Sequence, residues 1–184
     1  MEDLNLSSCI INSYYNGSFD ERSSDSNTNY KNVDFNKGTF EYSFLKAGKW
    51  YFEISLTKNN NTFSNKTSPT LTILPYTITF DTPVDEAIAK DTVQTFNFTH
   101  NIPKDLIKGG LINSYYNGSF DERSSDSNTN YSDIDFINGS FKYKFTKSGT
   151  FYFEIHVQSY NYLGDTTGSY GIEAFVKTPN ITVS

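Results

Sequence analysis

The sequence is poor in the residues that build most disulfide, redox and catalytic sites. It holds one cysteine, Cys9, and two histidines, His100 and His156. A lone cysteine excludes an intrachain disulfide, so packing or a bound ion must stabilise the fold. The two histidines do not occupy equivalent positions in the two copies of an internal repeat described below. No nucleophile elbow, phosphate loop or metal-protease motif is present. We therefore expect a protein that is not an enzyme.

Long apolar runs and clustered positive charge are also absent. No run approaches the roughly 20 apolar residues that span a membrane. Met1 is followed by Glu2 and Asp3, so a signal peptide or anchor is expected only outside this chain. The net charge is −6, with no cluster of Lys and Arg, which argues against nucleic acids and anionic membranes as partners. A protein partner is the remaining expectation.

An internal repeat defines the organisation of the chain. Residues 11–30, INSYYNGSFDERSSDSNTNY, recur letter for letter at residues 112–131, an offset of 101. A period of about 100 residues is the size of a domain rather than of a solenoid repeat. We predict two tandem domains, residues 1–75 and 76–184, of which the first lacks its N-terminal strands.

The composition and the hydrophobic pattern indicate strands. Aromatic residues make up 17% of the chain, and they alternate with polar residues over 40–44 and 50–56, and again over 141–145 and 151–157. We interpret each pair as a hairpin with a glycine-containing turn. Further strands are predicted at 70–74, 76–80, 92–99, 110–116, 169–176 and 180–183, and a short helical stretch at 85–90. The fold class is all-β, two tandem antiparallel β-sandwiches.

The segments FEYSFLKAGKWYFEISL and FKYKFTKSGTFYFEIHV resemble the paired late strands of immunoglobulin-like, filamin-like and cupredoxin-like sandwiches. The resemblance implies tandem Ig-like repeats of an extracellular surface protein. The chain departs from these families at the corner, where Trp50 or Phe151 stands in place of the immunoglobulin tyrosine. Glu53 and Glu154 hold the place of the cupredoxin cysteine, so copper binding is not expected.

The first copy has only ten residues before the repeat, so it lacks counterparts of the strands predicted at 76–80 and 92–99. One interpretation is that the chain is part of a longer array. The other is that a strand from a neighbouring molecule completes the open edge, because an uncovered edge invites pairing. The second interpretation predicts self-association into a filament or a cell-cell contact.

Two polar segments at 19–34 and 120–135, identical to each other over 19–30 and 120–131, carry candidate metal ligands. Their hard oxygen donors suit calcium, and the run Asp25-x-Asn27-x-Asn29 matches the start of an EF-hand loop, although Tyr30 replaces the required glycine. A solvated acidic loop left identical by recent duplication is the alternative. The candidate ligands are Asp20, Glu21, Asp25, Asn27, Asn29 and Asp34 in the first copy, and Asp121, Glu122, Asp126, Asn128, Asn130 and Asp135 in the second.

Surface chemistry supplies the remaining expectations. Nine Asn-x-Ser/Thr triplets are acceptors for N-glycosylation in a secretory pathway, with Asn16, Asn60, Asn65, Asn97, Asn117 and Asn138 as candidates. Aromatic side chains that face solvent form partner-binding patches, with Tyr14, Tyr15, Tyr30, Tyr115, Tyr116 and Tyr131 as candidates. The predicted function is a non-enzymatic extracellular structural or adhesion module that binds another protein. The alternative is a carbohydrate-binding module.

Overall fold

The computed structural model describes residues 8–58, 61–84, 87–160 and 172–184, which form two compact units, the first ending at Pro75 and the second beginning at Tyr76. Each unit is described by itself. The described residues include no helix with the length and apolarity that crossing a membrane requires.

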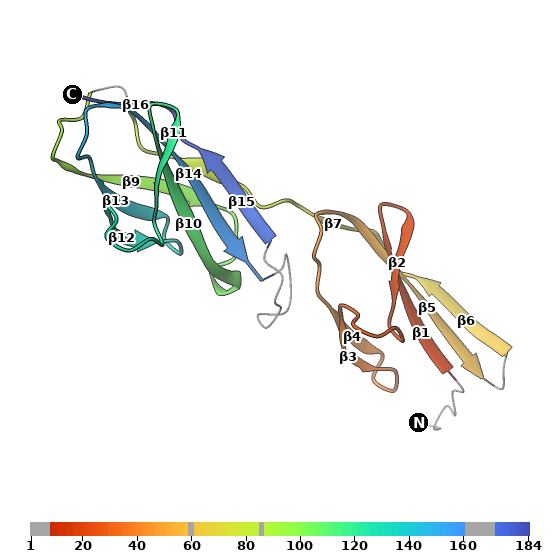
Figure 1. Ribbon diagram of the computed structural model, residues 1–184. Coiled ribbons are helices and arrows are strands. Elements are labelled where there is room, and N and C mark those ends of the chain that lie inside the picture. Colours follow the sequence, from red (N-terminus) through yellow and green to blue (C-terminus); the bar gives the residue numbers. More distant parts are fainter. Residues whose placement is uncertain (1–7, 59–60, 85–86, 161–171) are drawn as a thin grey trace. The chain divides into compact units, whose positions relative to one another are not determined.

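The first unit has two sheets (Figure 1). The larger runs in the order β2-β1-β5-β6, with β7 pairing β5, and the smaller consists of β3 and β4. The strands are β1 (Ser8–Tyr15), β2 (Ser18–Arg22), β3 (Tyr30–Asp34), β4 (Thr39–Tyr42), β5 (Gly48–Lys58), β6 (Asn61–Thr67) and β7 (Leu71–Ile73).

The second unit repeats this plan and adds strands at its start. Its sheets run β11-β10-β14-β15, with β16 pairing β14, and β12-β13-β9-β8. The elements are β8 (Ile78–Phe80), β9 (Val93–His100), the 3-10 helix η1 (Lys104–Leu106), β10 (Ile107–Tyr116), β11 (Ser119–Arg123), β12 (Tyr131–Asp135), β13 (Ser140–Lys144), β14 (Gly149–Ser159), β15 (Ile172–Lys177) and β16 (Ile181–Val183). In chain order these match the ABED and CFG sheets of an immunoglobulin-type sandwich, with β11 as an extra strand beside the C position. The predicted all-β fold of two Ig-like sandwiches is confirmed.

Aromatic side chains fill both cores because the strands alternate. Ile112, Phe141, Phe145, Phe153 and Ile155 of the second unit are fully buried. Their counterparts in the first unit are Ile11, Phe40, Phe44, Phe52 and Ile54, which belong to the same hydrophobic cluster as the buried Trp50. The prediction of one buried and one wet face along these strands is therefore correct.

The predicted hairpin over residues 40–56 is wrong. Strand β4 pairs β3, whereas β5 pairs β1, β6 and β7, so the chain crosses from one sheet to the other between them. Strands β13 and β14 are separated in the same way. Inward side chains of β4 and β5 therefore meet across the core, with the Phe40 and Phe52 ring centroids 5.2 Å apart. Alternation identifies the buried face but not the strand that accepts the backbone hydrogen bonds.

Two other local expectations need correction. The segments 19–34 and 120–135 are not loops throughout, because β2, β3 and their counterparts β11 and β12 occupy their ends. Asn16 and Gly17, with φ of 48° and 85°, form the tight turn between β1 and β2, and the Asn-Gly pair is the signal that could have located this hairpin. The described part of the 85–90 stretch is not helical; Ile88 makes a parallel bridge to Val183.

Candidate functional site

The exposed edge of β4 is the main difference between the two units. In the second unit β13 pairs β12 on one side and β9 on the other, and Figure 1 shows β9 running alongside β13. In the first unit β4 pairs β3, and no strand of the described residues pairs with its second edge. Strands β8 and β9 of the second unit thus have no counterpart among the described residues of the first. We call the second edge of β4 the open edge.

The backbone groups at the open edge can be assigned from the hydrogen bonds. The Ser43 amide donates to the Asn29 carbonyl, on the β3 side. Because successive amides of a strand point to opposite edges, the amides of Phe40, Tyr42 and Phe44 face the open edge. In the second unit the equivalent amide of Phe145 donates to the Thr92 carbonyl beside β9. No strand of the part of the chain that the structure describes pairs with these groups, and an edge of this kind can template strand addition.

The core beneath the open edge is incompletely covered. Tyr42 and Phe44 are 8% and 7% exposed, against 1% and 0% for Tyr143 and Phe145. Phe40 is half-buried, whereas its counterpart Phe141 is fully buried. In the second unit β9 covers this region, with the Phe96 ring centroid 5.2 Å from that of Phe141. The described residues of the first unit include no strand that corresponds to β9, which explains the greater exposure.

The acidic side chains predicted as calcium ligands already have partners within each unit. The carboxylate of Asp20 pairs with the Lys46 ammonium at 2.9 Å, and Glu21 accepts from the Asn29 amide at 2.9 Å. Asp25 accepts from the Arg22 amide at 3.1 Å. The second copy repeats these contacts as Asp121 with Lys147, Glu122 with Asn130 and Asp126 with Arg123.

The remaining candidate calcium ligands lie in or next to turns, where Asp34 and Asp135 accept hydrogen bonds from nearby backbone amides. Asp34 accepts from the amides of Asn36 and Lys37, and chiefly the Lys37 amide lowers the pKa of this carboxyl. Asp135 accepts from Ile137 and Asn138, and chiefly the Asn138 side-chain amide lowers its pKa. Asn27 and Asn128 adopt left-handed φ values of 61° and 62°. Over the ranges that the structure describes, no three His, Cys, Asp or Glu side chains gather as a metal site would require. Calcium binding stays a prediction of the sequence.

The predicted partner-binding tyrosines fall into three groups. Tyr30 and Tyr131 are 7% and 8% exposed and belong to the two cores, so we correct the expectation that they form a contact surface. Their burial raises the pKa of both phenols. Tyr15 and Tyr116 are half-buried and close the corner before β5 and β14, where their hydroxyls donate to the carbonyls of Ala47 and Ser148.

Tyr14 and Tyr115 lie on the outer face of the larger sheet in an aromatic row. The Tyr14 ring stacks on Tyr51 at 4.6 Å with an interplanar angle of 4°, and Phe19 meets Tyr14 edge-on at 6.0 Å. The Tyr14 hydroxyl donates to Glu53 at 2.8 Å, and this hydrogen bond raises the pKa of the phenol. The second copy repeats the row as Phe120, Tyr115 and Tyr152.

The glycosylation candidates lie at the surface where they are described. Asn65, Asn97 and Asn138 are exposed, as are Asn16 and Asn117 in their turns. The Asn16 side-chain carbonyl accepts from the Lys49 amide at 3.0 Å. Asn60 lies outside the described residues.

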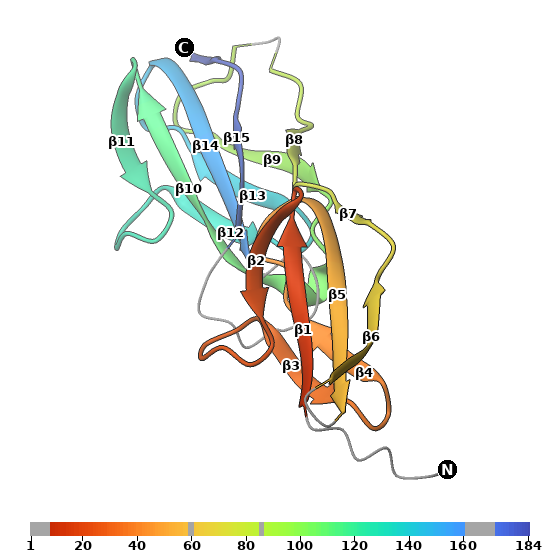
Figure 2. The same cartoon turned by 90° about the vertical axis from the view of Figure 1, so that its right-hand side faces the viewer.

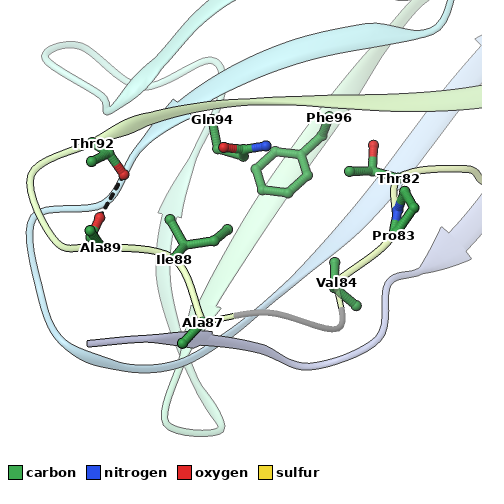
Figure 3. A pocket seen from close by; sticks show the side chains of 9 residues that line it. All are labelled: Thr82, Pro83, Val84, Ala87, Ile88, Ala89, Thr92, Gln94 and Phe96. Carbon is green, nitrogen blue, oxygen red and sulfur yellow. Dashed lines mark hydrogen bonds between the residues drawn. The ribbon is translucent and has the colours of Figure 1, made fainter.

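A cavity of about 660 Å³ lies in the second unit between the segment after β8 and strand β9 (Figure 3). Its walls are mainly apolar, and none of the nine lining residues is titratable: Thr82, Pro83, Val84, Ala87, Ile88, Ala89, Thr92, Gln94 and Phe96. The Thr92 hydroxyl donates to the Ala89 carbonyl at 2.5 Å, which closes one end. This cavity offers no side chain for acid–base chemistry.

No family model matches the sequence, and no curated protein matches it. Among solved structures, the chain is similar to the three N-terminal domains of the highly immunogenic outer capsid protein (Hoc) of bacteriophage RB49, with 11% identity, a TM-score of 0.44, and coverage of 97% of this chain and 57% of that one. It is also similar to the N-terminal four Ig domains of Dscam1 isoform 6.9, with 13% identity, a TM-score of 0.27, and coverage of 96% and 37%. The chain thus spans less than two thirds of each of these two chains, and at 11% and 13% identity the similarity is one of fold alone.

Proposed function

We propose that this protein is a non-enzymatic structural or adhesion module of the extracellular space or cell surface. It binds another protein by adding a strand to the open edge. The observation that carries the proposal is that β4 has one strand neighbour where its counterpart β13 has two. Strand addition uses main-chain hydrogen bonds for affinity and side-chain contacts for specificity. The open edge presents the amides of Phe40 and Tyr42, and the Phe40 side chain beside them is only half-buried.

The surroundings of the two histidines support the non-enzymatic part of the proposal. A second cavity, of about 200 Å³, lies beside Phe98, Ile102 and Ile137, and His100 is the only histidine that lines it. The Nε2 atom of His100 lies 3.0 Å from the Phe136 carbonyl oxygen. The other imidazole, of His156, contacts Glu173 on the outer face of β14, away from a described cavity. Neither arrangement pairs a nucleophile with a base in an enclosed site.

Carbohydrate binding is the second candidate, favoured by the aromatic row that recurs in both copies. Sugars bind on an open ring face, but Tyr14 and Tyr51 stack on one another and so cover one face each. Phe19, at 52% exposed, is the most accessible ring of the row. Glycan binding that is lost in a Phe19→Ala, Phe120→Ala double variant would favour this candidate.

Sedimentation velocity over a concentration series tests the protein-binding proposal in its homotypic form. The wild-type chain should associate, and Phe40→Lys should prevent association because it places a charge on the inward side of the open edge. Glu41→Lys is the matched control: it adds a lysine on the outward side of the same strand, where the second copy already has Lys142. It should associate like wild type.

Hydrogen exchange supplies the readout at the edge itself. The amides of Phe40 and Tyr42 should exchange faster than those of Phe141 and Tyr143 in the monomer, and should become protected on association. Equal protection in the two units, together with a wild-type chain that stays monomeric at every concentration, would refute an open edge that binds protein.

A further inference from the structure

The second unit contains a template for the ligand of the open edge. With the 101-residue offset, Phe141 corresponds to Phe40 and Tyr143 to Tyr42. Strand β9 runs antiparallel to β13 with Phe96 opposite Phe141 and Gln94 opposite Tyr143. A strand that paired with β4 in the same register would therefore place its equivalent of Phe96 opposite Phe40 and its equivalent of Gln94 opposite Tyr42.

The ring of Phe96 identifies the side chain that the first unit lacks. Its centroid lies 5.2 Å from Phe141, 6.1 Å from Phe145 and 5.2 Å from Phe153. All three rings are phenylalanines in the first unit as well, at positions 40, 44 and 52. The first unit therefore has the three phenylalanines that would surround such a ring, but its described residues include no counterpart of Phe96.

A retained glycine marks where the backbone of the missing strand would pass. Gly139 has φ of +75°, and a Cβ there would lie 1.9 Å from the carbonyl oxygen of Phe98 in β9. The Phe98 amide also donates to the Gly139 carbonyl at 2.9 Å. Gly38, the counterpart with φ of +70°, would have nothing within 4 Å of its Cβ. The close approach that Gly139 accommodates is thus unfilled at Gly38.

Resting on the proposed function, we infer that the ligand of the open edge is an extended polypeptide segment with the aromatic–polar–aromatic pattern of β9. It runs antiparallel to β4, inserts one aromatic ring between Phe40, Phe44 and Phe52, and lays its backbone against Gly38. Its outward residues are polar, because Thr95 and Asn97 of β9 are exposed whereas Phe96 and Phe98 are each 1% exposed.

A synthetic peptide of residues 92–102, TVQTFNFTHNI, tests this inference against the full-length chain. Trp50 is the only tryptophan of the protein and lies 5.5 Å from Phe44, so its emission reports on the first unit while the peptide is silent. The peptide should change Trp50 emission saturably and protect the amides of Phe40 and Tyr42 from exchange. A peptide with Phe96→Ser should bind at least about tenfold more weakly, because it lacks the inserted ring.

Gly38→Asn provides the receptor-side test. Asparagine tolerates a left-handed φ, so the substitution fills the open space with little backbone strain. It should weaken peptide binding at least about tenfold. Gly17→Asn is the matched control, because Gly17 also has a left-handed φ and open space but lies in the β1–β2 turn. It should bind the peptide like wild type.

A variant with the strand covalently attached provides a test that does not depend on the short peptide staying monomeric. A second copy of residues 76–110 placed before Ile10 supplies counterparts of β8 and β9 in the register of the second unit. It should raise the melting temperature reported by Trp50, and Phe96→Ser in the added copy should abolish the gain.

The outcomes separate this inference from the function on which it rests. If neither peptide nor tether stabilises the first unit, or if Phe96→Ser or Gly38→Asn has no effect, the inferred ligand is wrong. Association that remains sensitive to Phe40→Lys would then still support protein binding at the open edge. If Phe40→Lys also had no effect on association, both the inferred ligand and the proposed protein-binding function would be wrong.

Discussion

Replacing Phe40 with alanine should destabilise the first unit by about half as much as Phe141→Ala destabilises the second. Phe141 is fully buried and contacts three rings, those of Phe96, Tyr131 and Phe153. Phe40 is half-buried and contacts the rings of Tyr30 and Phe52. The two phenylalanines differ mainly by the ring that β9 contributes.

The magnitude follows from burial. Truncating a fully buried phenylalanine costs about 3–5 kcal/mol, so we expect about 4 kcal/mol for Phe141→Ala. An aromatic pair contributes about 0.5–1.5 kcal/mol beyond its buried area. Losing that pair and part of the burial lowers the expected cost of Phe40→Ala to about 2 kcal/mol.

Native-state hydrogen exchange measures both units in one sample, through the slowly exchanging amides of β5 and β14. Urea unfolding followed by Trp50 emission gives an independent value for the first unit. Phe19→Ala and Phe120→Ala are the controls, because both side chains are 52% exposed and each meets the equivalent tyrosine of its own unit, Tyr14 or Tyr115, edge-on. Each should cost no more than about 1 kcal/mol, and the two should agree. Equal losses for Phe40→Ala and Phe141→Ala would refute the argument, since they would require something to cover β4.

Three further outcomes are expected. Gly38→Ala should cost about 1–2 kcal/mol of backbone strain, whereas Gly139→Ala should cost clearly more in unfolding experiments because its Cβ meets the Phe98 carbonyl; equal costs would argue against the template. Hydrogen bonds lower the pKa of Asp34 and Asp135 on folding, so their contribution to stability is present above the unfolded pKa of 3.8 and is lost as pH falls through the lower folded pKa; carboxyl titration by NMR that finds folded values at or above 3.8 would contradict this. If the two acidic segments bind calcium, Asp25 and Glu21 must exchange their present partners, so calcium should shift the amide resonances of Arg22 and Asn29 relative to a chelator; unchanged resonances and an unchanged melting temperature would exclude calcium.

The comparison of the two copies explains why some positions match outside the identical tract. Residues 31–56 match 132–157 at 12 of 26 positions, most of them core side chains or turn glycines. Tyr51 and Glu53 are outward-facing and yet retained, and both contact Tyr14. Lys46 is also retained and pairs with Asp20. The matching positions therefore include residues that contact the identical segment 11–30 in the folded protein. A comparison of the two sequences alone does not reveal these contacts.

The sequence by itself determined the two tandem copies and the buried face of each aromatic strand, and it predicted that the first copy lacks two N-terminal strands. These follow from local periodicity and from the internal repeat, both of which can be read along the chain. Only the tertiary structure decided that β4 and β5 lie in opposite sheets, that Tyr30 and Tyr131 belong to the core, and that the acidic side chains bind backbone amides and lysines. The physical reason is that alternation specifies which way a side chain points, whereas the partner it meets depends on which distant strands pair.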